Sequence, residues 1–445
     1  MKILYSLITA PPSKTYGGEN HHITLAKYLK KEFNDVVSFV SYDVSMPEEI
    51  WRKFLLGKFK KNYKEGVYKV PIENLKVILR NPISFCAHNI FWKMCSRKSF
   101  DIKGSSYSTR MYYILKAVNI LSDYYSLRIG YFNPKLVKEI LESYKPEIVH
   151  VYGIHLFWLP YILHKVALKY ERIKTVIWTL YHHFIPYERF LFSRPKILKS
   201  VNDAHLVIAS TNYEKRIIYS MLKERGYSRD LDSIYVLPVP IDVSQFMHPP
   251  NDLLENLREY IGNPDYIILT MTLNRAKGSL NVLRSLVEYE LHGKIAFVSF
   301  GRSTPDELIE FKEITKKLPS NISAYYLGYV DEHTKASLYS ISDVFAMPSI
   351  ADSFGIAYAE AWYYNTPVIA DKNPVMEEVI GNMVRGILVD RNNVKEIQEA
   401  IRLLIEDKNL SNRLVTNGKR YLMHELNAKQ VTRKIRRLYQ KISEH

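Results

Sequence analysis

Short apolar runs alternate with amphipathic segments through most of this 445-residue chain, and this alternation constrains the fold more than any other feature. In the second half, such runs occupy residues 267–271, 295–300, 322–327, 344–347, 367–370 and 386–390. Most are followed by a segment in which apolar residues recur at helical spacing. Strands that alternate with helices form parallel sheets covered by helices. The second half therefore predicts an α/β domain.

The first half shows the same alternation with one long interruption. Predicted strands occupy residues 2–9, 36–42, 148–151, 174–180, 204–210 and 234–238, and predicted helices include 21–33, 135–143 and 213–224. The pattern is irregular from about residue 44 to 134. A chain of this length is expected to form two or three domains. We predict two doubly wound α/β domains, at residues 1–246 and 247–425, followed by a basic C-terminal helix at 426–445.

One predicted turn of the second domain carries two carboxylates. Asp352 is a favoured helix N-cap type, so a helix should begin near Phe354. Glu360 follows Asp352 after seven intervening residues, which places it two helical turns further in. Gly355 permits close backbone approach, and free N–H groups from Phe354 to Ile356 suit a phosphate. Anion-binding N–H groups beside carboxylates that accept sugar hydroxyls indicate a nucleotide-sugar site.

At these residues the chain resembles the retaining glycosyltransferases of family 4, which have the two-domain GT-B fold. Their signature is Glu, seven residues and Glu, followed by a Pro-Val-Ile-Ala strand, here residues 367–370. Asp352 stands in place of the first Glu, which shortens its reach. The resemblance covers about residues 1–43 and 146–442. It implies an α/β GT-B fold of two Rossmann-like domains facing a cleft. It also implies retaining transfer of a hexose from a UDP- or GDP-sugar to a hydroxyl of a glycan or lipid-linked acceptor.

The resemblance also implies residues that bind the donor. Lys277 and Gly278 match the family's Lys-Gly, whose cation holds the diphosphate. The family's Arg, five residues earlier, is Thr272 here, which leaves Arg275 as the candidate substitute. A second loop resembles the one whose backbone reads the nucleobase, and it consists of Gly328, Tyr329 and Val330. In the first domain, Gly18 belongs to a glycine pair at a predicted helix start, which suits an anion.

Three residues are expected to form the catalytic group. His182 follows a predicted strand, one residue later than the family's Thr-x-His spacing, and His183 stays open as the alternative. The carboxylate of Asp352 would hold hydroxyls of the transferred sugar. The carboxylate of Glu360 would accept the ribose hydroxyls. The resemblance thus names His182, Asp352 and Glu360 as the catalytic group.

The formal net charge of +16 favours a polyanionic partner, such as nucleic acid, anionic lipid or a phosphorylated substrate. Residues 51–100 hold twelve Lys and Arg against two acids, and residues 426–443 hold six against none. The segment 51–61 has the pattern of an interfacial membrane helix, or of a lid packed on the first domain. No RNA-module signature is present, so no nucleic-acid partner is expected.

The apolar runs and the cysteines indicate the cellular compartment in which the protein is expected. No run reaches the ~18 apolar residues of a membrane span, and residues 3–10 fit a first buried strand better than a signal peptide. Two cysteines, Cys86 and Cys95, fit a reducing interior. We expect a cytoplasmic protein that could meet the inner face of the cell membrane.

No metal or cofactor is expected beyond the donor substrate. His88 lies between the two cysteines, but this spacing matches no zinc pattern. Asp230 and Asp232 form a D-x-D triplet, which follows a charged turn and is interpreted as a solvated loop.

A different class of function stays open at this stage. The chain departs from the family at Thr272, Asp352, Val239-Pro240 and Asn373-Pro374. These departures are compatible with a catalytically inactive GT-B scaffold or a polyanion-binding protein. A GT-B phosphorylase fits less well, because no cofactor lysine signature is evident.

Overall fold

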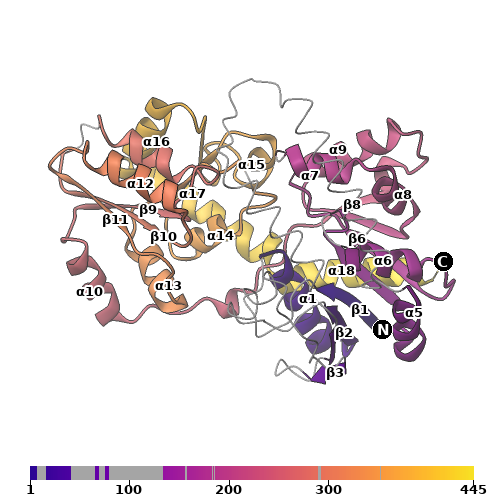
Figure 1. Ribbon diagram of the computed structural model, residues 1–445. Coiled ribbons are helices and arrows are strands. Elements are labelled where there is room, and N and C mark those ends of the chain that lie inside the picture. The colour runs from indigo at the N-terminus through magenta and orange to yellow at the C-terminus, as the bar shows by residue number, and fades with distance from the viewer. Residues whose placement is uncertain are drawn as a thin grey trace, which may run out of the picture. The chain divides into compact units, whose positions relative to one another are not determined.

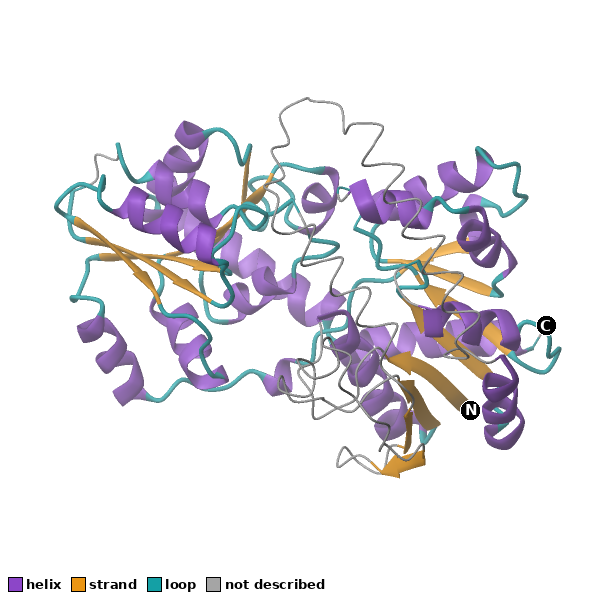
Figure 2. Cartoon of the chain, viewed as in Figure 1, coloured by secondary structure: helices purple, strands orange, loops and turns teal. Residues whose placement is uncertain are grey.

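The computed structural model describes residues 1–7, 17–41, 66–69, 76–79, 134–155, 158–182, 184, 186–288, 292–350 and 352–444. The predicted helix at 51–61, both cysteines, His88 and His183 lie outside these residues. The described chain contains two sheets with helices around them (Figures 1 and 2).

The first sheet has eight strands in the order β3-β4-β2-β1-β5-β6-β7-β8. Its strands are β1 (Lys2–Leu7), β2 (Val36–Ser41), β3 (Gly66–Lys69), β4 (Lys76–Leu79), β5 (Ile148–Tyr152), β6 (Lys174–Trp178), β7 (Leu206–Ala209) and β8 (Ile234–Val236). β3 runs antiparallel to β4, while β4, β2, β1, β5 and β6 pair in parallel. Every residue of β5 and β7 is buried, as expected for strands covered on both faces.

Helices follow most strands of the first sheet. They are α1 (Gly17–Phe33), α5 (Pro134–Tyr144), α6 (Trp158–Ala167), α7 (Pro186–Phe192), α8 (Pro195–Asp203) and α9 (Asn212–Lys223).

The second sheet has six parallel strands in the order β11-β10-β9-β12-β13-β14. Its strands are β9 (Tyr266–Met271), β10 (Ile295–Phe300), β11 (Ile322–Tyr326), β12 (Val344–Met347), β13 (Val368–Asp371) and β14 (Ile387–Val389). Numbered within the sheet, this order is 3-2-1-4-5-6, which is the doubly wound Rossmann arrangement. The order reverses between β9 and β12, and such sheets bind ligands at the carboxyl ends of the strands at this switch point.

The helices of the second half of the chain come before, between and after the strands of the second sheet. They are α10 (Asn251–Tyr260), α11 (Ser279–Ser285), α12 (Pro305–Thr315), α13 (Glu332–Ile341), α14 (Ile356–Tyr363), α15 (Pro374–Val379), α16 (Val394–Glu406), α17 (Lys408–Tyr421) and α18 (Ala428–Ser443).

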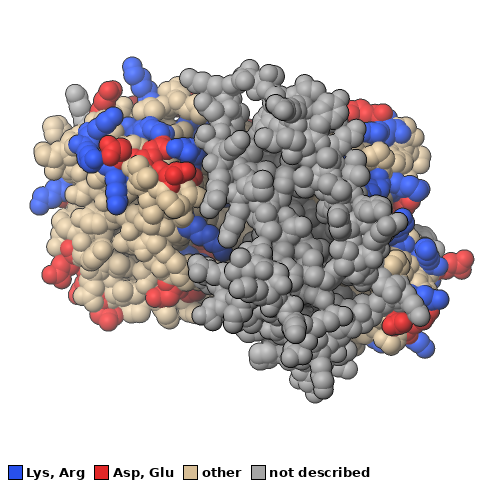
Figure 3. Space-filling model, viewed as in Figure 1, with Lys and Arg blue, Asp and Glu red and all other residues tan. Residues whose placement is uncertain are grey.

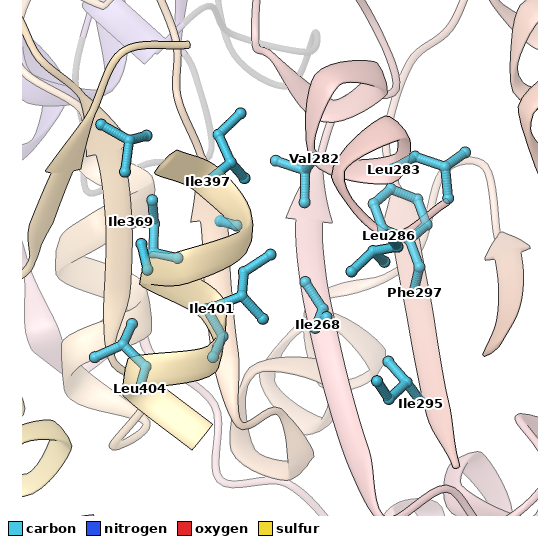
Figure 4. Packing of buried hydrophobic residues seen from close by; sticks show 14 of the residues in the cluster. Ile268, Val282, Leu283, Leu286, Ile295, Phe297, Ile369, Ile397, Ile401 and Leu404 are labelled. Carbon is cyan, nitrogen blue, oxygen red and sulfur yellow. The ribbon is translucent and has the colours of Figure 1, made fainter. Parts of the chain in front are cut away.

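A continuous apolar core fixes the second sheet against α11 and α16 (Figure 4). Ile268 and Phe297 project from β9 and β10, and they are fully buried. Leu283 of α11 and Ile401 of α16 are also fully buried in this cluster. The apolar positions of each helix recur at helical spacing, so one face covers the sheet. This core holds the strand ends, and therefore the loops that follow them, in fixed positions.

The structure confirms the predicted α/β alternation and corrects several element ends. α1 begins at Gly17, whereas the sequence predicted a loop through Gly18 and a helix from residue 21. The strand predicted at 174–180 ends at Trp178. The helix predicted to begin near Phe354 begins at Ile356, with Gly355 as its N-cap. α6, α7, α8, α10 and α15 were not predicted.

The described chain forms two compact units. One comprises Met1–Thr179, Arg194–Val207 and Tyr439–His445, and the other comprises Leu180–Ser193 and Ile208–Leu438. The second unit therefore contains His182 together with the six-stranded sheet. No helix among the described residues is long and apolar enough to cross a membrane. On the face in Figure 3, the Lys and Arg side chains drawn in blue lie among Asp and Glu.

Candidate functional site

Two loops meet at the switch point of the six-stranded sheet. One follows β9 and the other follows β12, and these strands are neighbours. The N–H of Ile350 donates to the carbonyl oxygen of Ala276 at 3.1 Å, which ties the loops together. The ammonium of Lys277 lies 2.7 Å from Oδ1 of Asp352. The structure thus brings two of the predicted site residues into direct contact.

Hydrogen bonds within the β9–α11 loop fix Lys277. Its N–H donates to Oδ1 of Asn274 at 2.7 Å, and the N–H of Asn274 donates to Oγ of Ser279 at 2.8 Å. Gly278 has φ +77°, and a Cβ on it would lie 2.5 Å from the carbonyl oxygen of Pro348. Only glycine fits this close approach, so the family's Lys-Gly pair has a steric basis here.

Arg275 lies in the same loop but contacts a different group. Its guanidinium forms an ion pair with Glu310 of α12, which also binds Arg284. Thr272, at the family's Arg position, has φ +63°, an uncommon conformation for a β-branched residue. The structure therefore joins Lys277, and not Arg275, to Asp352. The role of Arg275 as a substitute diphosphate ligand stays a prediction.

Arg391, which was not predicted, holds this loop from the segment after β14. Its Nη1 donates to the carbonyl oxygen of Ala276 at 3.3 Å, and its Nη2 donates to that of Arg275. Its own N–H donates to Asp371 at 3.3 Å. Nothing local in the sequence links residue 391 to residue 276, because the contact depends on the order of strands in the sheet.

The two carboxylate oxygens of Asp352 differ in their hydrogen bonds, because Oδ1 accepts from Lys277. Burial alone raises the pKa of its carboxyl, but the charge and hydrogen bond of Lys277 and the hydroxyl of Ser349 outweigh burial and lower the pKa. The carboxylate is therefore ionised at neutral pH. Its Oδ2 is buried and has no hydrogen-bond partner among the described residues. An unsatisfied buried acceptor is costly, and a ligand hydroxyl would satisfy it.

The start of α14 offers backbone donors beside this carboxylate. Gly355 has φ +82°, and a Cβ there would lie 2.5 Å from the ring of Tyr358. The first N–H groups of a helix have no acceptor within the helix. Phe354, Gly355 and Ile356 lie at this helix start. Anion binding by their N–H groups stays a prediction.

Glu360 is engaged by side chains of α13. One carboxylate oxygen lies 2.9 Å from the ammonium of Lys335, and the other accepts from the Tyr339 hydroxyl at 3.3 Å. Burial alone would lower the pKa of Lys335, but Glu360 and Glu332 raise it. Sequence reasoning missed both partners. The only available signal was that Lys335 and Tyr339 share one face of a predicted helix.

His182 lies on a turn that is held by two buried acids. Leu180 has φ +42°, and the N–H of Tyr181 donates to Glu214 at 2.8 Å. Nδ1 of His182 lies 3.0 Å from Oε2 of Glu188. Burial lowers the pKa of His182, but Glu188 and, more weakly, Asp352 outweigh it, so the pKa is raised.

The remaining predicted residues lie on other loops. Gly328 has φ +65°, and its carbonyl oxygen accepts from the N–H of Gly301 at 2.6 Å, which joins the loops after β10 and β11. Tyr329, which follows Gly328, is exposed, and Val330 is half-buried. Gly18 lies in the first turn of α1, in the other unit.

The acidic triplet is exposed in the structure. Asp232 lies in a single 3-10 turn, Leu231–Ser233, and its carboxylate is 3.8 Å from Lys215. Across the described ranges, no group of three or more His, Cys, Asp or Glu residues could hold a metal ion.

Residues 258–421 match the family model of glycosyl transferases group 1. The second half of this chain is therefore similar to that family. The match includes both switch-point loops, with Lys277, Asp352 and Glu360. This finding agrees with the resemblance drawn from the sequence.

Two relatives show how far the similarity extends. The D-inositol 3-phosphate glycosyltransferase of Xylanimonas cellulosilytica is 26% identical over 219 residues, or 48% of this chain and 51% of that protein. The O-antigen chain mannosyltransferase B of Escherichia coli is 22% identical over 311 residues, or 69% of this chain and 76% of that protein. The chain therefore spans about half the length of the first relative and about three quarters of the second.

Solved structures resemble the chain over nearly its whole length. The Anabaena HepE complex with UDP and glucose has a TM-score of 0.64 at 15% identity, covering 99% of this chain and 100% of that one. The trehalose-6-phosphate synthase OtsA has a TM-score of 0.71 at 12% identity, covering 99% of each chain. At these identities the likeness concerns the fold, and it confirms the predicted GT-B fold class.

Proposed function

We propose that this protein is a retaining glycosyltransferase that moves a hexose from a UDP- or GDP-sugar to a hydroxyl of a glycan or lipid-linked acceptor. The contact between Lys277 and Asp352, at the switch point of the family-matched sheet, carries this proposal. Relatives named as glycosyltransferases and neighbours solved with UDP and with UDP-glucose support it.

The chemical task is to stabilise negative charge on the departing diphosphate while the sugar becomes oxocarbenium-like. Lys277 supplies a fixed positive charge, and the N–H groups at the start of α14 supply dipoles. In the structure, Asp352 balances the charge of Lys277 at 2.7 Å. When donor binds, its phosphates would share Lys277, and Oδ2 of Asp352 would accept a sugar hydroxyl.

We assign the other predicted site residues to parts of the donor. Glu360 would accept the ribose hydroxyls, in a position held by Lys335 and Tyr339. His182 would lie by the reacting sugar. Gly18, Arg275 and the loop of Gly328, Tyr329 and Val330 stay proposed donor-binding residues. No metal or further cofactor is proposed.

Release of nucleoside diphosphate from a panel of UDP- and GDP-sugars, without acceptor, tests this function. Slow donor hydrolysis by the purified protein would support an enzyme. The alternatives are a catalytically inactive GT-B scaffold and a polyanion-binding protein. Tight, salt-sensitive binding to nucleic acid, with neither binding nor hydrolysis of any donor, would favour the latter.

We further propose that the enzyme meets an anionic membrane surface, where a lipid-linked acceptor would be available. The observation behind this is α18, whose buried residues Val431, Ile435 and Tyr439 line one face. The exposed residues of the helix include Arg433 and Arg437. Clustered cations near a surface contribute about 1 kcal/mol each to binding anionic lipid.

Sedimentation with liposomes checks the membrane proposal. The protein should pellet with vesicles that contain anionic lipid and stay in the supernatant with neutral vesicles. Exchanging Arg433 and Arg437 for Gln should weaken pelleting about tenfold or more. The control Lys316→Gln, at an exposed residue directly after α12, should leave pelleting unchanged. Equal recovery in the supernatant with both lipid mixtures would rule out membrane association.

A further inference from the structure

Glu188 is a buried acid with no role in the site described so far. It lies in the first turn of α7 and is 3% exposed. One carboxylate oxygen, Oε2, lies 3.0 Å from Nδ1 of His182 and also accepts the N–H of His182 at 3.1 Å. A carboxylate can only accept hydrogen bonds, so Nδ1 carries the proton that is donated. This assigns the ring orientation and leaves Nε2 as the nitrogen available to a ligand.

We propose that Glu188 is the positioning residue for His182: its carboxylate fixes the imidazole through Nδ1 so that Nε2 serves the sugar site. This inference rests on the proposed function. It adds a residue that neither the family motif nor the sequence spacing indicated. Fixing a ring through its second nitrogen is also how enzymes orient a histidine that contacts substrate.

The charges around His182 explain why this acid matters. Glu188 of α7 and Asp352 of the β12–α14 loop favour the protonated ring, and Lys277 of the β9–α11 loop disfavours it. Glu188 is the strongest of the charged neighbours. Without it, burial and Lys277 would both favour the neutral ring. Glu188 therefore sets the proton on His182 as well as its orientation.

Glu214 shows that the turn has a separate backbone anchor. This acid is 2% exposed, and its two oxygens accept the N–H groups of Tyr181 and Ser210 at 2.8 and 2.6 Å. Glu214 holds the main chain before His182 but makes no contact with its ring among the described hydrogen bonds. Removing the charge of Glu188 should therefore release the ring while the turn stays in place.

The test compares Glu188→Gln with the wild type by NMR of 13Cε1-labelled histidine in the ligand-free protein. His182→Gln identifies the resonance of His182. In Glu188→Gln, the pKa of His182 should fall by about one unit or more. The control variant Glu399→Gln, at an exposed position of α16, should leave the pKa of His182 unchanged. Glu188→Asp keeps the negative charge, so the pKa of His182 in this variant should lie between those of Glu188→Gln and the wild type. This variant keeps the test valid if Glu188→Gln unfolds.

Transfer activity provides the second measurement. Glu188→Gln should lower kcat at least tenfold and move the pH profile of kcat, with little change in KM for donor, and Glu188→Asp should recover part of the rate. An unchanged titration of His182 in Glu188→Gln would overturn the inference. A shifted titration in a protein that turns over no donor would instead contradict the proposed function, so the two failures are distinguishable.

Discussion

Lys277→Ala should lower sugar transfer by about 10²- to 10³-fold, the usual effect of removing one group that stabilises a developing oxyanion. Lys277 is held by the hydrogen bonds of its loop and lies 2.7 Å from Asp352. Its charge is thus fixed beside the start of α14 before donor arrives, and no other described cation contacts Asp352. Initial rates at saturating donor and acceptor measure the loss.

Glu360→Ala should lower transfer by a similar factor, because the ribose would lose its proposed acceptor. Both variants should melt near the wild-type temperature. Lys277 and Glu360 are partly exposed, and Lys335 retains Glu332 at 2.7 Å when Glu360 is removed. Lys316→Ala, an exposed lysine of the same unit, serves as the control. Wild-type rates in both Lys277→Ala and Glu360→Ala would refute the assignment of the site.

The protein should lose stability as the pH falls from 6.5 to 5.5, because three buried histidines of the first unit resist protonation. His21, His22 and His150 are at most 2% exposed, and their rings lie 4.5 to 4.7 Å apart in the two closest contacts. Burial lowers the pKa of His21 to about 3. Burial and neighbouring ring charge lower the pKa of His22 and His150 well below the usual value.

The direction of the pH effect follows from proton binding. The unfolded chain takes up protons on these rings below about pH 6.5, whereas the folded rings stay neutral far below that pH. Stability is therefore complete above pH 6.5 and falls as the pH decreases. The slope approaches about 1.4 kcal/mol per pH unit for each ring only well below pH 6.5. Between pH 6.5 and 5.5 each ring contributes about 1 kcal/mol, so the three contribute about 3 kcal/mol, against a typical total of about 5–15 kcal/mol.

Urea unfolding followed by tryptophan fluorescence between pH 7.5 and 5.5 measures this slope. His21→Phe keeps the ring contacts with Tyr152 and Trp178 but cannot titrate, so it should reduce the slope by about a third. His424→Phe, at an exposed position, should leave the slope unchanged. A free energy of unfolding that is constant from pH 7.5 to 5.5 would contradict the description of this cluster.

The sheets could be predicted because their strands are continuous apolar runs, which only burial on both faces explains. The helix after β12 shows where local rules failed. Asp352 is a favoured N-cap residue, yet its carboxylate binds Lys277 and Ser349, and Gly355 is the N-cap of the helix instead. A tertiary ion pair therefore outweighed a local capping preference.

The site could be predicted in part for a related reason. Lys277, Asp352 and Glu360 belong to short motifs, so each was found through the resemblance of its motif to the family's. Their partners come from elements placed by strand order: Lys335 is 25 residues from Glu360, and Arg391 is 115 from Ala276. Glu188 is only six residues from His182, but its contact depends on α7, which the sequence pattern did not indicate.

A thermal-shift screen with UDP- and GDP-sugars, repeated on Glu360→Ala, tests the central claim most directly. A donor that binds only the folded state stabilises it by about 2.7 kcal/mol when the donor concentration is 100 times Kd, and the melting temperature rises as a result. We expect donors of one base class to stabilise the wild type and to lose this effect in Glu360→Ala. That result would locate the donor at α14 and identify its base. Equal stabilisation of both proteins, or none by any donor, would contradict a donor site built on Lys277, Asp352 and Glu360.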